Sequence, residues 1–178
     1  MKKILKISFW LMFLVYIALM LDLFFRIEYF IGVLQGRFIT GARNFNVIPF
    51  YTIKEFMEKA EDNPWLAIYN ILGNIIVFIP YGMYLPIIKK SNRLGENMSV
   101  VLLTSLIIEI IQYTFNVGAF DVDDLILNTL GGFIGISAYF IMLKIFKRRE
   151  KAKNVIAMLS LAVGVPIIFL GLILLWHN

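Results

Sequence analysis

Six polar side chains lie within, or at the ends of, long apolar runs of this sequence. They are four amides and two carboxylates: Asn70, Asn74, Glu109, Gln112, Asp124 and Asn128. An acidic segment, residues 120–124, lies between two of the apolar runs. Polar and ionisable groups in hydrocarbon are costly unless they meet partners or water. A chain that gathers them near one membrane face is therefore expected to build a polar site there.

The carboxylates point to a small set of chemistries. Glu109 and Asp124 would each need a cation, a shared proton or an arginine nearby, and Arg43 is the basic residue expected on the same membrane face. Asp121, Asp123 and Asp124 invite a divalent cation, since Mg²⁺ and Ca²⁺ prefer carboxylate oxygen. No EF-hand spacing is present, so no metal ligand is assigned and the cofactor stays open. The structural alternative is that these groups join helices, with Asp121 or Asp124 as a helix cap.

The composition is that of an integral membrane protein. Of the 178 residues, 60% are hydrophobic, and the mean hydropathy is +0.81, whereas soluble domains are about 45–50% apolar. The net charge is +5, with basic residues between the apolar runs, so we expect a bilayer and no nucleic acid as partner. The chain has no cysteine, and its single histidine, His177, is the penultimate residue. Thiolate chemistry is thus excluded, and histidine acid–base catalysis is not expected.

Five apolar runs are long enough to cross about 30 Å of hydrocarbon, which takes about 20 helical residues. They cover residues 7–25, 65–88, 98–115, 124–146 and 155–176. The sequence therefore predicts an all-α, polytopic membrane bundle of about five transmembrane helices in a single domain, 1–178. Before the second run, Thr52 and Glu55 fit a capping box, which predicts a short amphipathic helix outside the membrane.

Two features predict how the helices pack. Gly131 and Gly135 form a small-xxx-small pattern, which lets a neighbouring helix approach closely. Pro80 lies inside the second run and cannot donate to the carbonyl of Ile76, so a bend is expected there.

Lysine and arginine predict the orientation. Basic residues precede the first run and fill the joins between runs two and three and between runs four and five, whereas 116–123 has none. Basic joins are cytoplasmic by the positive-inside rule. We therefore expect a multi-pass protein with a cytoplasmic N-terminus and an extracytoplasmic C-terminus. The segment 26–64 is the exception, since it carries five basic residues and is still placed outside.

Four segments resemble the motifs of the VanZ-like family, in the family's order. Residues 43–50 read Arg-Asn-Phe-Asn-Val-Ile-Pro-Phe, similar to Arg-x-x-Asn-Leu-Ile-Pro-Phe. Residues 70–82 contain Asn-x-x-x-Asn and Phe-x-Pro-x-Gly, 109–112 read Glu-x-x-Gln, and 120–131 begin Phe-Asp-x-Asp-Asp.

The resemblance covers residues 43–139 and departs from the pattern at Ala119, where many members carry arginine or another polar residue. The last segment, 147–178, lies outside it and is expected to be an additional C-terminal transmembrane helix. The departure at Ala119 removes a local partner for the acids.

The resemblance implies a bacterial cytoplasmic-membrane protein of the type linked to resistance to teicoplanin and related lipoglycopeptides. We expect an outward-facing polar pocket that binds a lipid-linked envelope precursor or an amphiphilic antibiotic. The expected lining is Arg43, Asn46, Asn70, Asn74, Glu109, Gln112, Asp121, Asp123, Asp124 and Asn128. One alternative is a membrane enzyme that holds a divalent cation against lipid head groups, and another is a small transporter or flippase. No catalytic residue is assigned.

Overall fold

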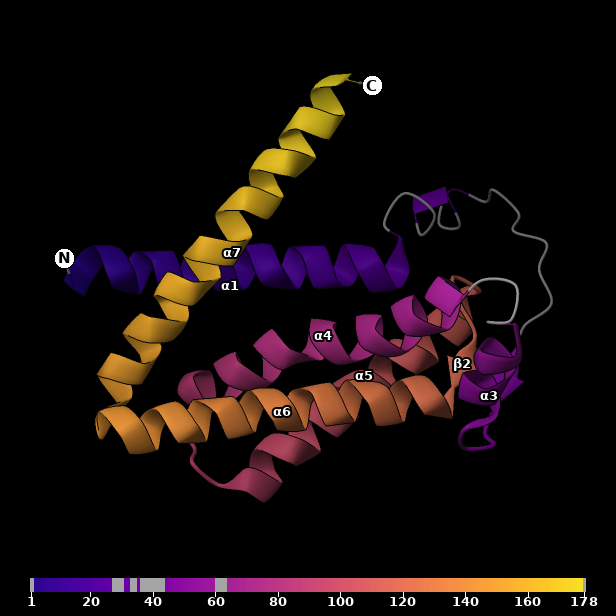
Figure 1. Ribbon diagram of the computed structural model, residues 1–178, viewed down its shortest axis with the longest axis horizontal. Helices are drawn as coiled ribbons and strands as arrows, with labels where there is room; N and C mark the ends of the chain where they lie inside the picture. Colours follow the sequence, from indigo (N-terminus) through magenta and orange to yellow (C-terminus); the bar gives the residue numbers. More distant parts are fainter. Residues whose placement is uncertain (1, 27–30, 33–34, 36–43, 60–63, 178) are drawn as a thin grey trace.

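Five long helices and one short helix make up the described part of the chain (Figure 1). The computed structural model describes residues 2–26, 31–32, 35, 44–59 and 64–177. The long helices are α1 (Lys2–Phe25), α4 (Pro64–Lys89), α5 (Leu94–Phe115), α6 (Val122–Phe146) and α7 (Arg149–His177). The short helix is α3 (Tyr51–Lys59), and two short strands, β1 (Phe45–Asn46) and β2 (Phe120–Asp121), pair in parallel. The predicted all-α class and the predicted short helix are confirmed.

The helices match the predicted membrane spans. In the described part of the chain, α1, α4, α5 and α6 are long and apolar enough to cross a membrane. Helix α7 covers the fifth predicted run. Most side chains of its C-terminal part lie outside the described set, so a fifth span stays a prediction.

Helices α4 and α6 run in the same direction, and α5 runs in the opposite direction beside them (Figure 1). The N-terminus of α1, the α4–α5 join and the α6–α7 join lie toward one end of the bundle, whereas α3 and β2 lie at the other. Helix α7 crosses α1 obliquely. Arg149 links the two joins, because its Nη2 donates to Asn92 Oδ1 at 2.7 Å.

The α4–α6 pair is packed at backbone contact. A Cβ atom added at Gly131 would overlap the carbonyl oxygen of Ile75, and one added at Gly135 would overlap that of Ile79. From the other side, Gly82 meets the backbone of Gly132. The close approach predicted from the glycine spacing is confirmed. Helix α4 continues through its two internal prolines, and the bend expected at the first of them stays a prediction.

Two apolar clusters fill the bundle. One joins α1, α4, α6 and α7 around the buried rings of Tyr84 and Tyr139. The other joins α1, α4, α5 and α6 around Phe78 and Ile136. Both clusters mix residues from helices distant in sequence, so each helix is held by several others.

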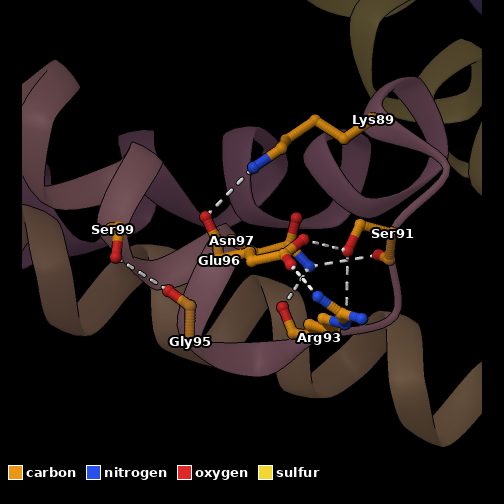
Figure 2. Close-up of polar contacts among 7 residues, drawn as sticks. All are labelled: Lys89, Ser91, Arg93, Gly95, Glu96, Asn97 and Ser99. Atoms are coloured by element: carbon orange, nitrogen blue, oxygen red, sulfur yellow. Dashed lines mark hydrogen bonds and ion pairs between the residues drawn. The ribbon is translucent and has the colours of Figure 1, made fainter.

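The turn between α4 and α5 is fastened by a buried amide that the sequence reasoning did not single out (Figure 2). Asn97 is fully buried, and its Nδ2 donates to the carbonyl oxygens of Ser91 at 3.1 Å and Arg93 at 2.9 Å. Glu96 accepts from Ser91 Oγ at 2.7 Å and from Arg93 Nη1 at 2.8 Å. This end of the bundle therefore has its own polar contacts, apart from the predicted site.

Gly135→Ala should destabilise the protein, because the new methyl group has no space beside the Ile79 carbonyl. Overpacking of this kind costs about 1–3 kcal/mol. The measurement is thermal unfolding of the purified protein in one detergent. Gly73→Ala on α4 is the matched control, since a Cβ there meets no atom within 4 Å and the change favours a helix by about 0.5–1 kcal/mol. Equal melting temperatures for the two variants would contradict the close-packing argument.

Candidate functional site

The site is assembled by pairing two segments far apart in sequence. Strands β1 and β2 place Phe45 beside Phe120 and Asn46 beside Asp121. The Phe120 N–H donates to the carbonyl oxygen of Asn44 at 3.1 Å, and the rings of Phe45 and Phe120 stack with centroids 4.9 Å apart. The predicted motif segment 43–50 is thus anchored, from Asn44 onward, on the acidic segment 120–124.

Two of the acids cap helices. Asp121 Oδ1 accepts the N–H of Asp123 at 2.9 Å, which caps α6, and also accepts from Asn46 Nδ2 at 3.1 Å. The carboxylate of Asp123 accepts the N–H groups of Phe50 and Ile53, the latter at 3.1 Å. Asp123 therefore caps α3 from a distant part of the chain. Of the two cap candidates in the sequence, Asp121 is confirmed.

The predicted capping box of α3 is wrong, although the helix itself is present. Thr52 lies within α3, and its Oγ1 accepts from Asn46 Nδ2 at 2.9 Å. Glu55 pairs with Lys59 at 2.6 Å on the exposed side. A carboxylate offers two acceptor oxygens to a helix start, so Asp123 supplies in one side chain what a local capping box divides between two residues.

Glu109 is the most deeply buried acid of the set, with 0% of its surface exposed. Its Oε2 accepts the N–H of Asp121 at 2.9 Å. Its Oε1 has no hydrogen-bond partner among the described residues. Arg43, the expected counter-charge, lies outside the described residues.

Side-chain amides join α6 to its neighbours. Asn74 Nδ2 on α4 donates to Asp124 Oδ1 at 2.5 Å, and Asn128 Nδ2 donates to Ser105 Oγ on α5 at 3.0 Å. Within the described part of the chain, Asn128 Oδ1 and Thr129 Oγ1 are buried without a partner. The network therefore presents several buried oxygens that could accept hydrogen bonds.

Ser105 and Thr129 were missed by the sequence reasoning. A usable signal for Ser105 was its spacing, because it lies four residues before Glu109 and therefore on the same face of α5. Thr129 carried no comparable signal, since a threonine next to Asn128 in an apolar helix is ordinary.

The structure sorts the ten predicted residues into four groups. One region, at the end where α6 begins, contains Asn46, Asn74, Glu109, Asp121, Asp123, Asp124 and Asn128. Gln112 instead donates from Nε2 to the carbonyl oxygen of Phe24 at 3.0 Å, which ties α5 to α1. Asn70 is half-buried one turn before Asn74. Arg43 is not described. Whether any of these residues binds a ligand stays a prediction.

The acids are compensated mainly by N–H groups. Asp121, Asp123 and Asp124 lie at the N-terminus of α6, where the helix dipole favours negative charge. Among the described residues, no ion pair joins these three acids or Glu109 to a lysine or arginine; the pairs found are exposed, such as Lys54 with Glu58. In the same residues, no three Asp, Glu, His or Cys side chains are placed to hold one metal ion.

Asp123→Ala should free the segment that leads into α3. The change leaves the N–H groups of Phe50 and Ile53 without their acceptor, and loss of a helix cap costs about 0.5–2 kcal/mol. Amide hydrogen exchange at these two positions should therefore become about tenfold faster, since 1.4 kcal/mol corresponds to a factor of ten. Glu58→Ala, on the exposed face of α3, is the control. Unchanged protection in Asp123→Ala would mean that other contacts hold α3.

Comparison with known proteins places the chain in a family. The model of the VanZ/LLP1 family matches residues 12–147, which include most of α1 and all of α4, α5 and α6. Protein VanZ of Enterococcus faecium is 36% identical over 97 residues, 54% of this chain and 53% of that protein, so the match spans about half the length of this curated relative. No solved structure matches the chain. This membrane protein of four apolar helices or more therefore belongs to the VanZ/LLP1 family.

Proposed function

We propose that this protein is an accessory protein of the bacterial cell envelope that lowers susceptibility to teicoplanin and related lipoglycopeptides. It would act through the polar region where α6 begins, by binding an amphiphilic ligand. That ligand is either a lipid-linked envelope precursor or the lipoglycopeptide itself. The proposal extends the family membership with the chemistry of the buried oxygens.

The observation that carries the ligand proposal is a set of buried acceptors without partners among the described residues. In the polar region these are Glu109 Oε1, Asn128 Oδ1 and Thr129 Oγ1. A buried acceptor that is left without a hydrogen bond costs about 1–3 kcal/mol. Such atoms therefore favour a ligand rich in hydrogen-bond donors. Sugar hydroxyls, peptide amides and ammonium groups are donors of this kind, and envelope precursors and glycopeptides carry them. The hydrocarbon part of an amphiphile would remain in the bilayer.

Glu109→Gln is the substitution that tests the proposal. It keeps the size of the side chain and one carbonyl oxygen but removes the ionisable carboxyl group and replaces its second oxygen with an NH₂ donor. A teicoplanin-susceptible bacterium that expresses the protein should show a raised minimum inhibitory concentration, and Glu109→Gln should return it to the level of the empty vector. Glu96→Gln is the matched control, because Glu96 is on the same helix at the opposite end.

Membrane levels of each variant are measured by immunoblot in the same cells. If Glu109→Gln is present at the normal level and still gives full resistance, the buried acid has no part in the activity. If its level falls to zero, the acid is needed for folding, and the ligand-binding proposal loses its main support.

The polar region should face the outside of the cell. This follows from the basic residues at the opposite end of the bundle, which include Lys89 at the end of α4 and Lys90 and Arg93 after it. A reporter enzyme active only outside the cytoplasm, fused after Ala119, should be active, and the same reporter after Lys147 should be inactive. The reverse pattern would place the polar region in the cytoplasm and contradict direct contact with an envelope ligand.

A further inference from the structure

The segment that leads into α3 exposes an unbroken run of apolar side chains. Val47, Ile48, Phe50 and Tyr51 are 55%, 62%, 62% and 53% exposed, and Pro49 between them is exposed as well. Five consecutive exposed apolar residues are not expected on a surface that faces water, unless they serve a function. This run is therefore expected to face an apolar environment rather than water.

The backbone of the run is held in place. Asn46 Oδ1 accepts the N–H of Ile48 at 3.0 Å, and the carboxylate of Asp123 accepts those of Phe50 and Ile53. Phe50 has φ 66°, a left-handed conformation that is unfavourable for an aromatic residue and persists only where the surroundings impose it. Hydrogen bonds to the Asn46 and Asp123 side chains thus hold the backbone in a conformation that exposes these apolar side chains.

The run lies at the level where a membrane span begins. Asn46 pairs with Asp121, one residue before the candidate span of α6, which starts at Val122. At the same end, Trp65 and Tyr69 at the start of α4 are exposed and stack with centroids 6.0 Å apart. Exposed Trp and Tyr at the end of an apolar helix are typical of the head-group level of a bilayer.

The direction of the run and its neighbours agree with this level. In Figure 1 the segment that leads into α3 projects sideways from the end of the bundle at which α6 begins. The charged residues of α3 pair with one another, Lys54 with Glu58 and Lys59 with Glu55, and all four are exposed in large part. Residues 47–59 thus combine a charged helix with an apolar loop, as segments at a membrane surface do.

We infer that residues 47–51 form an apolar wedge that inserts into the adjacent leaflet of the bilayer, with lipid acyl chains as its partner. The wedge would hold the start of α3, and through Asn46 and Asp123 the acidic segment, at a set depth beside the leaflet. This inference does not depend on the proposed resistance function, because it concerns contact with lipid alone.

Single-cysteine labelling tests the wedge cleanly, since the chain has no cysteine of its own. Ile48→Cys and Val47→Cys replace exposed side chains whose main-chain contacts are kept, and Lys54→Cys on α3 is the matched control. Each variant of the full chain carries a polarity-sensitive fluorophore in nanodiscs of phosphatidylcholine and phosphatidylglycerol. The quenchers are doxyl-labelled phosphatidylcholine in the bilayer and iodide in the water.

The wedge predicts a blue-shifted emission at positions 47 and 48 relative to position 54, with intensity lost to the doxyl lipid and retained in iodide. Position 54 should show the opposite pattern. Quenching of positions 47 and 48 by iodide, as at position 54, would overturn the inference by placing the loop in water. Protection from both quenchers would also overturn it, because a second copy of the chain or another protein would then cover the loop.

Discussion

The contact between α4 and α6 is the constraint on which the polar region depends. In a bilayer, helices gain nothing by hiding apolar surface from lipid, so association relies on close packing and interhelical hydrogen bonds. The missing side chains at Gly131 and Gly135 let the carbonyl groups of Ile75 and Ile79 approach α6 directly. Asn74 immediately precedes the first of these carbonyls and reaches Asp124. A single register of α4 against α6 therefore produces both the close contact at the glycines and the hydrogen bond between Asn74 and Asp124.

The acids of the polar region also build the fold. Asp121 caps α6 and Asp123 caps α3, while Glu109 accepts the N–H of Asp121. Backbone donors can stabilise a carboxylate as a counter-charge does, so Asp121 and Asp123 are stabilised without a neighbouring lysine among the described residues. Asp123 also holds the apolar wedge in place, because it accepts the N–H of Phe50. The acids that stabilise the fold are therefore among the residues proposed to lie at the ligand site.

The pair formed by Asn46 and Asp121 separates two environments. On one side lie Glu109 and the unpartnered oxygens of Asn128 and Thr129 on α6, and on the other lie the exposed apolar residues 47–51. An amphiphile has the same division into a donor-rich head and a hydrocarbon tail. The proposed ligand class and the proposed lipid contact thus fit one end of one bundle, although each stands on its own observations.

Much of this protein could be predicted from the order of its residues. The helices were predictable because hydrocarbon demands long apolar runs whose backbone groups are satisfied internally. The close contact at Gly131 and Gly135 was predictable because its spacing places both on one helix face. The polar residues were predictable because they interrupt apolar runs, and seven of the ten lie in one region.

Which atoms meet was decided by the tertiary structure alone. Thr52 and Glu55 have the spacing of a local capping box, yet Asp123, about 70 residues away, accepts the N–H groups at the start of α3. Gln112 has the spacing to accompany Glu109, yet it bonds to α1. Ser105 gained a role only because α6 brings Asn128 against it. Local spacing states which side chains share a face; the partner of each face depends on helix register and strand pairing, which are set by contacts between segments far apart in the chain.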